Sequence, residues 1–302
     1  MNVQALLRQA TGLNLSKAAA ERAVRQRMAE RACTDSDSYL RELGADELAQ
    51  LVELVVVPES WLFRDPQAFH AATAFVRRRM AGAGRPLRIL SLPCAAGEEP
   101  YSMAMALRDA GVPDDAYSID AVDLSPACIA RARRGVYGRN AFRGGDTGFR
   151  ERYFSHVGED EYRIAEALRA QVHFSQGNLL RFDTASYAGY YDVVFCRNLL
   201  IYFDKPTTAA AIATLAALLA EDGMLLAGYA EVPSFCRHGF TPLQHKQAFA
   251  LGKRPAAPPP APTAPRPARS LFAASTPPAA APRAPPRAPL PASASAPCLA
   301  PA

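Results

Sequence analysis

Hydrophobic positions follow two different periods along the chain, and the period changes between residues 75 and 87. Before that point apolar side chains recur at helical spacing, as in "SKAAAERAVRQRMAERA", which begins at a plausible cap, Ser16. Two shorter helices are expected in "DSDSYLRELG" and "ADELAQLVELVVV", the first of them ended by Gly44. A proline-marked turn and a further helix follow in "PESWLFRDPQAFHAATAFVRRRM". The pattern predicts an all-helical N-terminal domain over residues 1–75.

From residue 87 short apolar runs alternate with helical segments. Strands are expected in "LRILSL", "AYSIDAVDL", "QVHFSQGNLL", "YYDVVFCRNLLIYF" and "MLLAGYAE", and helices in "EEPYSMAMALRDAG", "SPACIARARRG" and "KPTTAAAIATLAALLAEDG". This alternation predicts an α/β domain with a doubly wound sheet over residues 76–254. Residues 136–170 interrupt the rhythm, so we expect a small inserted subdomain there, with a short antiparallel ribbon around "EYRIAE".

The last segment, residues 255–302, differs in composition from everything before it. It carries 16 of the 26 prolines and no acidic residue. Such a segment cannot bury enough apolar surface to offset its chain entropy, so we predict a disordered spacer. Binding of other signalling proteins through the prolines is the alternative.

Charge and hydropathy exclude several classes of protein. Four arginines of the tail supply four of the five net positive charges, which leaves the folded part nearly neutral and argues against a general nucleic-acid binder. No apolar run approaches the roughly 20 residues that span a bilayer. The start of the chain also lacks a signal-peptide pattern, so we expect a cytoplasmic protein without membrane insertion.

The six cysteines give no sign of a metal or disulfide site. They are scattered, with no Cys-x-x-Cys pair. We therefore expect reduced thiols that pack as small hydrophobic groups, and no metal.

The turn after the first predicted strand, "PCAAGEEPYS", indicates the kind of ligand. It has one glycine, Gly97, which allows close approach of the backbone, and Glu98, which would repel a phosphate. The second strand ends at Asp123, an acid suited to a ribose diol. A nucleoside with cationic groups and no pyrophosphate fits these residues, and S-adenosylmethionine is such a ligand. A glutamate at a helix start can instead simply complement the helix dipole.

Several short motifs occur in a characteristic order. "GEEPYS", "RRGVY", "RYF", "NLL" and "FCRNLLIYFD" resemble the CheR family of chemoreceptor glutamate methyltransferases, and "ESWLFRD" resembles that family's Thr-x-Phe-Phe-Arg segment. The resemblance covers residues from about 10 to 250. The alanine-rich turn and the proline-rich tail resemble the WspC-like subgroup, from surface-sensing systems that control biofilm formation. The family implies a class I S-adenosylmethionine methyltransferase sheet with an inserted β-subdomain, behind a helical N-terminal domain.

The resemblance also implies roles for individual positions. The cofactor-binding candidates are Ser60, Arg64, Gly97, Glu98, Asp123, Asn178, Leu179, Arg197 and Asn198. The catalytic candidates, near the acceptor, are Arg64, Asn198 and Tyr202. Ala95 and Ala96 replace a frequent Ser-Thr, and Pro58 stands where an asparagine contact is usual. The cofactor's identity is therefore better determined than its affinity.

The implied reaction is methyl transfer to a glutamate side chain on the cytoplasmic helices of a methyl-accepting chemoreceptor. A glutamate is already ionised at neutral pH, so the reaction needs no general base or metal, and positioning of the reactants is the main requirement. We expect Arg64 to steer the acceptor carboxylate and Tyr202 to fix its geometry. The alternatives are a surface ion pair of Arg64 with Asp65 or a neighbouring residue, and Tyr202 as a core aromatic at the end of a strand.

Arginines on the second helix offer a surface for an acidic acceptor. Helical spacing brings at least three of Arg22, Arg25, Arg27 and Arg31 near one face. A solvated helix face is the plain explanation, and electrostatic steering of acidic receptor helices is the functional one. Two competing functions remain at this stage. One is a class I methyltransferase for another substrate, and the other is a catalytically weak adaptor that binds the cofactor without consuming it.

Overall fold

The structure is a computed structural model of the chain and describes residues 2–145 and 147–254. The predicted tail, residues 255–302, lies outside the described residues. Five helices precede the first strand: α1 (Val3–Thr11), α2 (Lys17–Glu30), α3 (Ser36–Arg41), α4 (Ala45–Glu53) and α5 (Pro66–Met80). Within the described part of the chain, no helix is both long enough and apolar enough to cross a bilayer.

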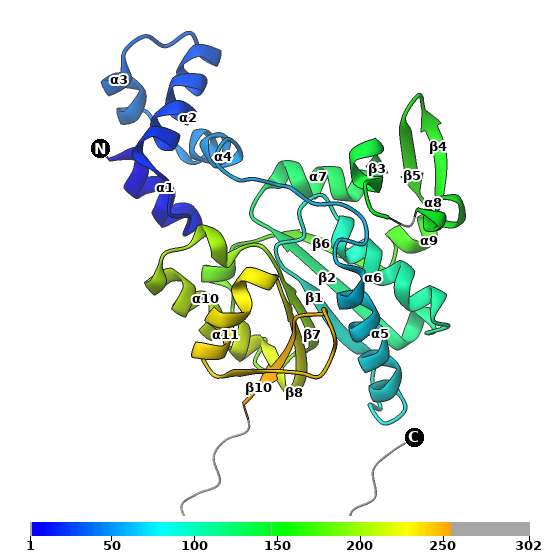
Figure 1. Cartoon of the computed structure of the whole chain (residues 1–302). Helices are drawn as coiled ribbons and strands as arrows, with labels where there is room; N and C mark the ends of the chain where they lie inside the picture. The colour runs from blue at the N-terminus through cyan, green and yellow to red at the C-terminus, as the bar shows by residue number, and fades with distance from the viewer. Residues whose placement is uncertain (1, 146, 255–302) are drawn as a thin grey trace, which may run out of the picture. The chain divides into compact units, whose positions relative to one another are not determined.

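Seven strands form the main sheet, in the spatial order β6-β2-β1-β7-β8-β10-β9 (Figure 1). They are β1 (Leu87–Ser91), β2 (Tyr117–Asp123), β6 (Val172–Gln176), β7 (Tyr191–Cys196), β8 (Leu219–Ala227), β9 (Phe240–Pro242) and β10 (Ala250–Lys253). The pairs from β6 to β8 are parallel, and β10 runs antiparallel to both of its neighbours. After β1 the chain forms β2 on one side of it, and the later strand β7 lies on the other side of β1. The strand order therefore reverses between β1 and β7, where open α/β sheets bind their ligands.

Helices cover both faces of this sheet, with α5 and α6 on one face and α10 and α11 on the other (Figure 1). The bounds beyond α5 are α6 (Glu98–Asp109), α7 (Pro126–Arg134), α10 (Lys205–Leu218) and α11 (Val232–Arg237), with short 3-10 turns η1 (Asp114–Ala116), η3 (Leu179–Arg181), η4 (Leu200–Tyr202) and η5 (Tyr229–Glu231). Val193 and Phe195 of β7 join the core under α5 and α6, and Val194 and Cys196 join the core under α10. This period of two buries both faces of the strand, so residues 193–196 form a continuous apolar run after the buried Asp192.

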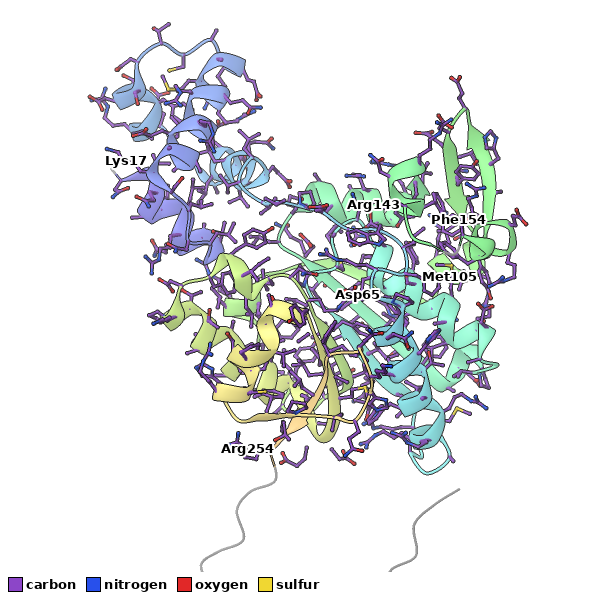
Figure 2. The ribbon with its side chains drawn as sticks, in the orientation of Figure 1. Lys17, Asp65, Met105, Arg143, Phe154 and Arg254 are labelled. Carbon is purple, nitrogen blue, oxygen red and sulfur yellow. The ribbon has the colours of Figure 1, made fainter. Side chains whose placement is uncertain are left out.

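The interruption predicted at residues 136–170 is a small antiparallel subdomain with strand order β3-β5-β4. Its elements are β3 (Val136–Tyr137), η2 (Arg139–Phe142), α8 (Gly148–Tyr153), β4 (Phe154–Gly158), β5 (Glu161–Ile164) and α9 (Glu166–Arg169). Phe154 packs edge-on against Phe142, with ring centroids 5.1 Å apart. Figure 2 labels Phe154 on this insert and Arg143 where the insert meets the segment before α5.

The helices α1 to α4 have a small hydrophobic core of their own, centred on Leu7, Val24, Tyr39 and Leu51. The helix α5 does not belong to this core. Its Phe69 stacks on Phe195 of β7, with ring centroids 5.5 Å apart, in the core of the sheet. The boundary expected at residue 75 thus falls inside α5, a helix that packs on the sheet.

Three local predictions are wrong. Gly44 does not end α3, because its extended backbone (φ −87°, ψ −178°) makes it the N-cap of α4. The helix α10 ends at Leu218 and not at Gly223, because Leu219 already pairs with Tyr191 in the sheet. Tyr202 does not end a strand: β7 stops at Cys196, and Tyr202 lies in η4. The cap at Ser16 is confirmed, since its side chain accepts a hydrogen bond from the N–H of Ala19.

Candidate active site

A cavity opens where the strand order reverses, between the carboxyl ends of β1, β2 and β7 and the segments 11–15 and 55–64. Eight of the ten predicted site residues line it: Ser60, Arg64, Asp123, Asn178, Leu179, Arg197, Asn198 and Tyr202. The cavity is formed largely because parallel strands end at the same edge of the sheet. The N-terminal segments close its other side.

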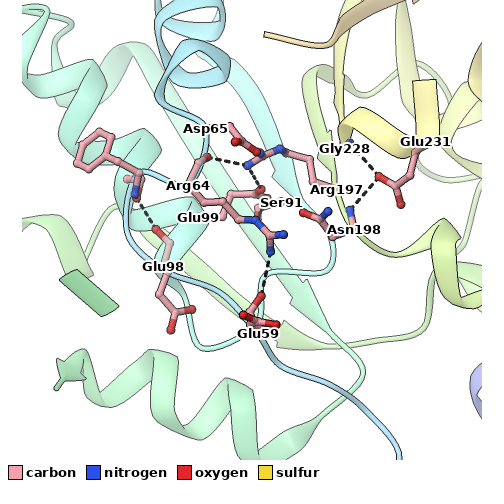
Figure 3. Close-up of polar contacts among 12 residues, drawn as sticks. Glu59, Arg64, Asp65, Ser91, Glu98, Glu99, Arg197, Asn198, Gly228 and Glu231 are labelled. Atoms are coloured by element: carbon pink, nitrogen blue, oxygen red, sulfur yellow. Dashed lines mark hydrogen bonds and ion pairs between the residues drawn. The ribbon is translucent and has the colours of Figure 1, made fainter. Parts of the chain in front are cut away.

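Arg197, directly after β7, is the centre of a buried polar network (Figure 3). The residue is 5 % exposed. Its guanidinium donates to the carbonyl of Arg64 (3.0 Å) and to Glu99 Oε2 (3.3 Å), and it also pairs with the carboxylate of Asp65. The hydroxyl of Ser91 donates to Glu99 Oε1 (2.8 Å). Burial raises the pKa of Glu99, and the charge of Arg197 opposes this shift. The network fixes the backbone on both sides of the cavity floor.

The Arg64 guanidinium remains available to a ligand. It donates to the backbone carbonyl of Glu59 (3.1 Å), and its Cζ lies 4.5 Å from the centroid of the Trp61 ring. Asp65 pairs with Arg197, so the surface ion pair considered for Arg64 does not form. Within residues 2–145 and 147–254, no carboxylate pairs with Arg64. The cavity therefore contains a cation that a carboxylate of another molecule can bind.

Asp123 holds the turn after β1. Its carboxylate accepts hydrogen bonds from the N–H of Ala95 (2.8 Å) and the N–H of Ser125 (2.9 Å), and it lines the cavity. Ala95 has a left-handed backbone (φ 49°), which costs energy for a residue with a Cβ and is held here by that bond. Burial raises the pKa of Asp123 to about 6. A carboxylate has about four acceptor positions, so acceptor capacity remains for a ligand's hydroxyl group.

Gly97 and Glu98 come at the end of this turn, where α6 begins, and they do not line the cavity. Gly97 has φ 92°, and an added Cβ would come within 3.0 Å of the Tyr137 hydroxyl and of Ala132 Cβ. The glycine is thus required by packing within the protein. Glu98 is 5 % exposed, and its Oε2 has no partner among the described residues. It lines a second cavity, which shares Pro58, Glu59 and Ser60 with the first, and burial raises its pKa to about 7.

Asn198 is shaped by a residue that the motifs did not indicate, Glu231 in η5. The carboxylate of Glu231 is 1 % exposed and accepts four backbone hydrogen bonds of 2.7–2.8 Å. The donors are the N–H groups of Asn198, Leu199, Leu200 and Gly228. They hold Asn198 in a left-handed conformation (φ 59°) at the cavity wall. An acid just beyond the end of β8 was the available signal, because β8 ends beside β7.

The remaining predicted residues differ in the hydrogen bonding and burial of their side chains. Asn178 donates to the carbonyl of Ala10 (2.8 Å) and accepts from the N–H of Leu180 (2.9 Å), so its amide joins α1 to the sheet. Leu179 is buried. Tyr202 is 40 % exposed at the cavity, so it is not a core aromatic.

Comparison with known proteins agrees with this geometry. Residues 59–248 match the family described as "CheR methyltransferase, SAM binding domain". The chain belongs to the CheR methyltransferase family. The family's domain has S-adenosylmethionine as its cofactor, and the sheet and insert are those of a class I S-adenosylmethionine methyltransferase.

Two of the similar proteins are named for biofilm formation. The chain is 48 % identical over 262 residues to the "Probable biofilm formation methyltransferase WspC" of Pseudomonas aeruginosa, covering 84 % of this chain and 61 % of that protein. It is 47 % identical over 251 residues to the protein of the same name in Pseudomonas putida, covering 81 % and 59 %. The "Chemotaxis protein methyltransferase" of Escherichia coli is 30 % identical, with 73 % and 78 % covered. The chain thus spans about three fifths of the length of the WspC relatives.

Proposed function

We propose that this CheR-family protein transfers the methyl group of S-adenosylmethionine to glutamate side chains of a methyl-accepting chemoreceptor, in the cytoplasm, in surface-sensing or chemotaxis signalling. The observation that carries the proposal is the half-buried guanidinium of Arg64, which lines the cavity without a carboxylate partner in the described part of the chain. A carboxylate acceptor would complete this site with a charge-assisted hydrogen bond. The names of the WspC and chemotaxis relatives support a receptor as the acceptor.

The residues around the cavity fit a cationic nucleoside. The unpartnered Oε2 of Glu98 lies at the second cavity, which shares Pro58, Glu59 and Ser60 with the first, and suits an ammonium group. The acceptor capacity left on Asp123 suits a ribose hydroxyl. Leu92, Val122 and Leu179 give the cavity an apolar wall suited to an adenine ring. The amide of Asn178 is already bonded, so we assign the adenine contact to its backbone and to Leu179.

The bound cofactor supplies an electrophilic methyl group on a sulfonium. The protein's own contribution is to bind and orient the acceptor, because an unperturbed glutamate (pKa ~4.3) is already an ionised nucleophile at neutral pH. Arg64 holds the acceptor carboxylate, and Asn198 and Tyr202 shape the wall beside it. The segments 11–15 and 55–61 cover the cavity and keep water away. Orientation of this kind can supply about 7–11 kcal/mol of a reaction barrier.

Replacing Arg64 with alanine should lower methyl transfer by about 10²-fold, since the acceptor carboxylate would lose its orienting cation. The assay measures base-labile labelling of chemoreceptor-rich membranes by S-adenosylmethionine carrying a labelled methyl group. Arg78→Ala is the matched control, because Arg78 is exposed on α5 and has no side-chain partner in the described part of the chain. Wild-type protein that binds the cofactor by calorimetry and labels no receptor would contradict the proposal and indicate a different acceptor or a non-catalytic adaptor.

Cofactor affinity should rise with pH between about 5.5 and 7.5. The raised pKa of Glu98, about 7, means that at lower pH the carboxyl binds a proton that a cationic ligand must displace. Below that pKa the dissociation constant should fall by up to about tenfold for each unit by which the pH is raised. The upper limit is set by the cofactor's own α-amino group, which titrates near ~7.7–8.0. Calorimetry at several pH values checks this, and Glu98→Gln should bind weakly, with a smaller pH dependence that is confined to the range near pH 6 where Asp123 titrates. A wild-type affinity that is independent of pH would remove Glu98 from the site.

Fewer of the arginines on α2 are available to an acidic acceptor than the sequence indicated. Arg27 is half-buried and bonds the carboxylates of Glu30 and Glu47, and Arg31 lies 3.6 Å from Glu47. Arg22 and Arg25 are exposed and have no side-chain partner within residues 2–145 and 147–254. These two arginines are therefore the ones on α2 that can attract an acidic receptor helix.

A further inference from the structure

Trp61, the single tryptophan of the chain, lies beside two arginines from distant parts of the sequence. The Cζ of Arg64 is 4.5 Å from the centroid of its ring, and the Cζ of Arg143, from the insert, is 4.2 Å away. We propose that Trp61 and Arg143 are positioning residues, which hold the Arg64 guanidinium where the acceptor carboxylate arrives. This inference deepens the proposed function and rests on it for its catalytic consequence.

Glu59 joins the two arginines. Its backbone carbonyl accepts from Arg64 Nη1 (3.1 Å), and its carboxylate accepts from Arg143 Nη2 (2.9 Å). The N–H of Leu62 also donates to the carbonyl of Ala141 in the insert (2.9 Å). The segment that carries Arg64 is therefore attached to the insert by a backbone bond, an ion pair and a shared aromatic ring.

These contacts decide where the Arg64 side chain lies. Its guanidinium contacts the Trp61 ring and donates to the Glu59 carbonyl, both in this cluster, and the Arg64 charge also interacts with Glu99. A free arginine side chain has many rotamers, and fixing them before the acceptor binds removes that entropy cost from the binding step. Arg143 is half-exposed and its ion pair alone contributes little. We infer that its effect comes from restraining the Trp61 ring and the Glu59 side chain.

The charges of the cluster also suit a carboxylate acceptor. Glu59 offsets one of the two arginines, so the group of three charged side chains is left with one net positive charge beside the cavity. Because Glu59 is bonded to Arg143, its carboxylate is held away from Arg64 and does not compete with the acceptor. Loss of Arg143 would free Glu59 to pair with Arg64 and block it.

The fluorescence of Trp61 tests the positioning directly and needs no acceptor. Arg143→Gln should shift the emission to longer wavelength and raise the acrylamide quenching constant about twofold, since the ring loses a stacked cation. Arg163→Gln is the matched control, because Arg163 is an exposed residue of the same insert with no side-chain partner among the described residues. Wild-type fluorescence in the Arg143 variant would overturn the proposal, whether or not the chain methylates a receptor.

Kinetics test the catalytic consequence. Arg143→Gln and Trp61→Ala should each lower kcat for methyl transfer by about tenfold, with an unchanged dissociation constant for S-adenosylmethionine and partial rescue by Trp61→Phe. In an Arg64→Lys background the same changes should have little further effect, because they act through Arg64. Effects that multiply independently of Arg64, or that appear only in cofactor affinity, would contradict the positioning role. Absence of receptor labelling by the wild type would count against the proposed function, while the fluorescence result would still decide the positioning.

Discussion

Replacing Glu231 with alanine should lower the free energy of unfolding by about 3–5 kcal/mol, one of the largest effects expected for a single residue outside the large hydrophobic side chains. The carboxylate is 1 % exposed and accepts the N–H groups of Asn198, Leu199, Leu200 and Gly228. Its removal leaves these four backbone donors without that acceptor in the interior of the protein. Urea denaturation of the full chain measures the loss.

Two further variants separate the hydrogen bonds from general packing. Glu231→Gln keeps one acceptor oxygen and turns an amide N–H₂ toward two N–H donors, so it should also be destabilising, by less than alanine. Glu221→Ala is the control, since Glu221 is exposed and pairs with Lys253 at the surface. If Glu231→Gln matched the wild type in stability, the carboxylate would not be holding the Asn198 turn.

Replacing Arg197 with methionine should cost a similar amount, about 3–5 kcal/mol, because it leaves the buried carboxylate of Glu99 without its cation. Burial already raises the pKa of Glu99, and loss of Arg197 removes the main opposing charge. A carboxyl whose pKa is raised in the folded state favours folding at low pH and loses that contribution as pH rises. The deficit of the variant should therefore be smaller near pH 5 than near pH 7.5, in urea titrations at both pH values.

A second substitution tests that explanation. In Glu99→Gln the buried charge is gone, so adding Arg197→Met should cost less there than in the wild type. Equal costs in both backgrounds would mean that Arg197 acts through its bonds to Asp65 and to the Arg64 carbonyl, and not through Glu99.

The parts of the fold that depend on residues close together in the sequence could be predicted from it. The short apolar runs of β1 and β7, the Ser16 cap and the acid at the end of β2 are local patterns, and the structure has each of them. Gly44 was misassigned because a glycine between two short helices can end one or begin the next, and only its backbone angles distinguish these roles. The early end of α10 depends on the pairing of Leu219 with Tyr191, a contact that helix propensity does not contain.

The supporting residues of the site could not be predicted in this way. Glu231 meets the Asn198 turn across 33 positions of sequence, and Arg143 meets Glu59 across 84. No spacing rule connects such residues, because the connection is made by adjacent strands or by an insert folding back. Gly97 has a packing role that the motif did not indicate, since an added Cβ would come within 3.0 Å of the Tyr137 hydroxyl and of Ala132 Cβ. Its contact with the cofactor stays a prediction.

One feature of the cavity links ligand binding to the cohesion of the protein itself. Its walls come from two parts of the protein: segment 11–15 lies in the helical part, and Asn178 and Tyr202 lie in segments that follow β6 and β7 of the sheet. Several polar contacts join these parts directly, among them Asn178 to the Ala10 carbonyl, the N–H of Asn14 to the Tyr202 carbonyl, and the Ser125 hydroxyl to Glu53. A ligand that touches both walls adds its binding energy to this joint, by RT ln(1 + [L]/Kd). Bound cofactor therefore also stabilises the contact between the two parts. Without it, the helical part that presents Arg22 and Arg25 would be held less strongly to the sheet.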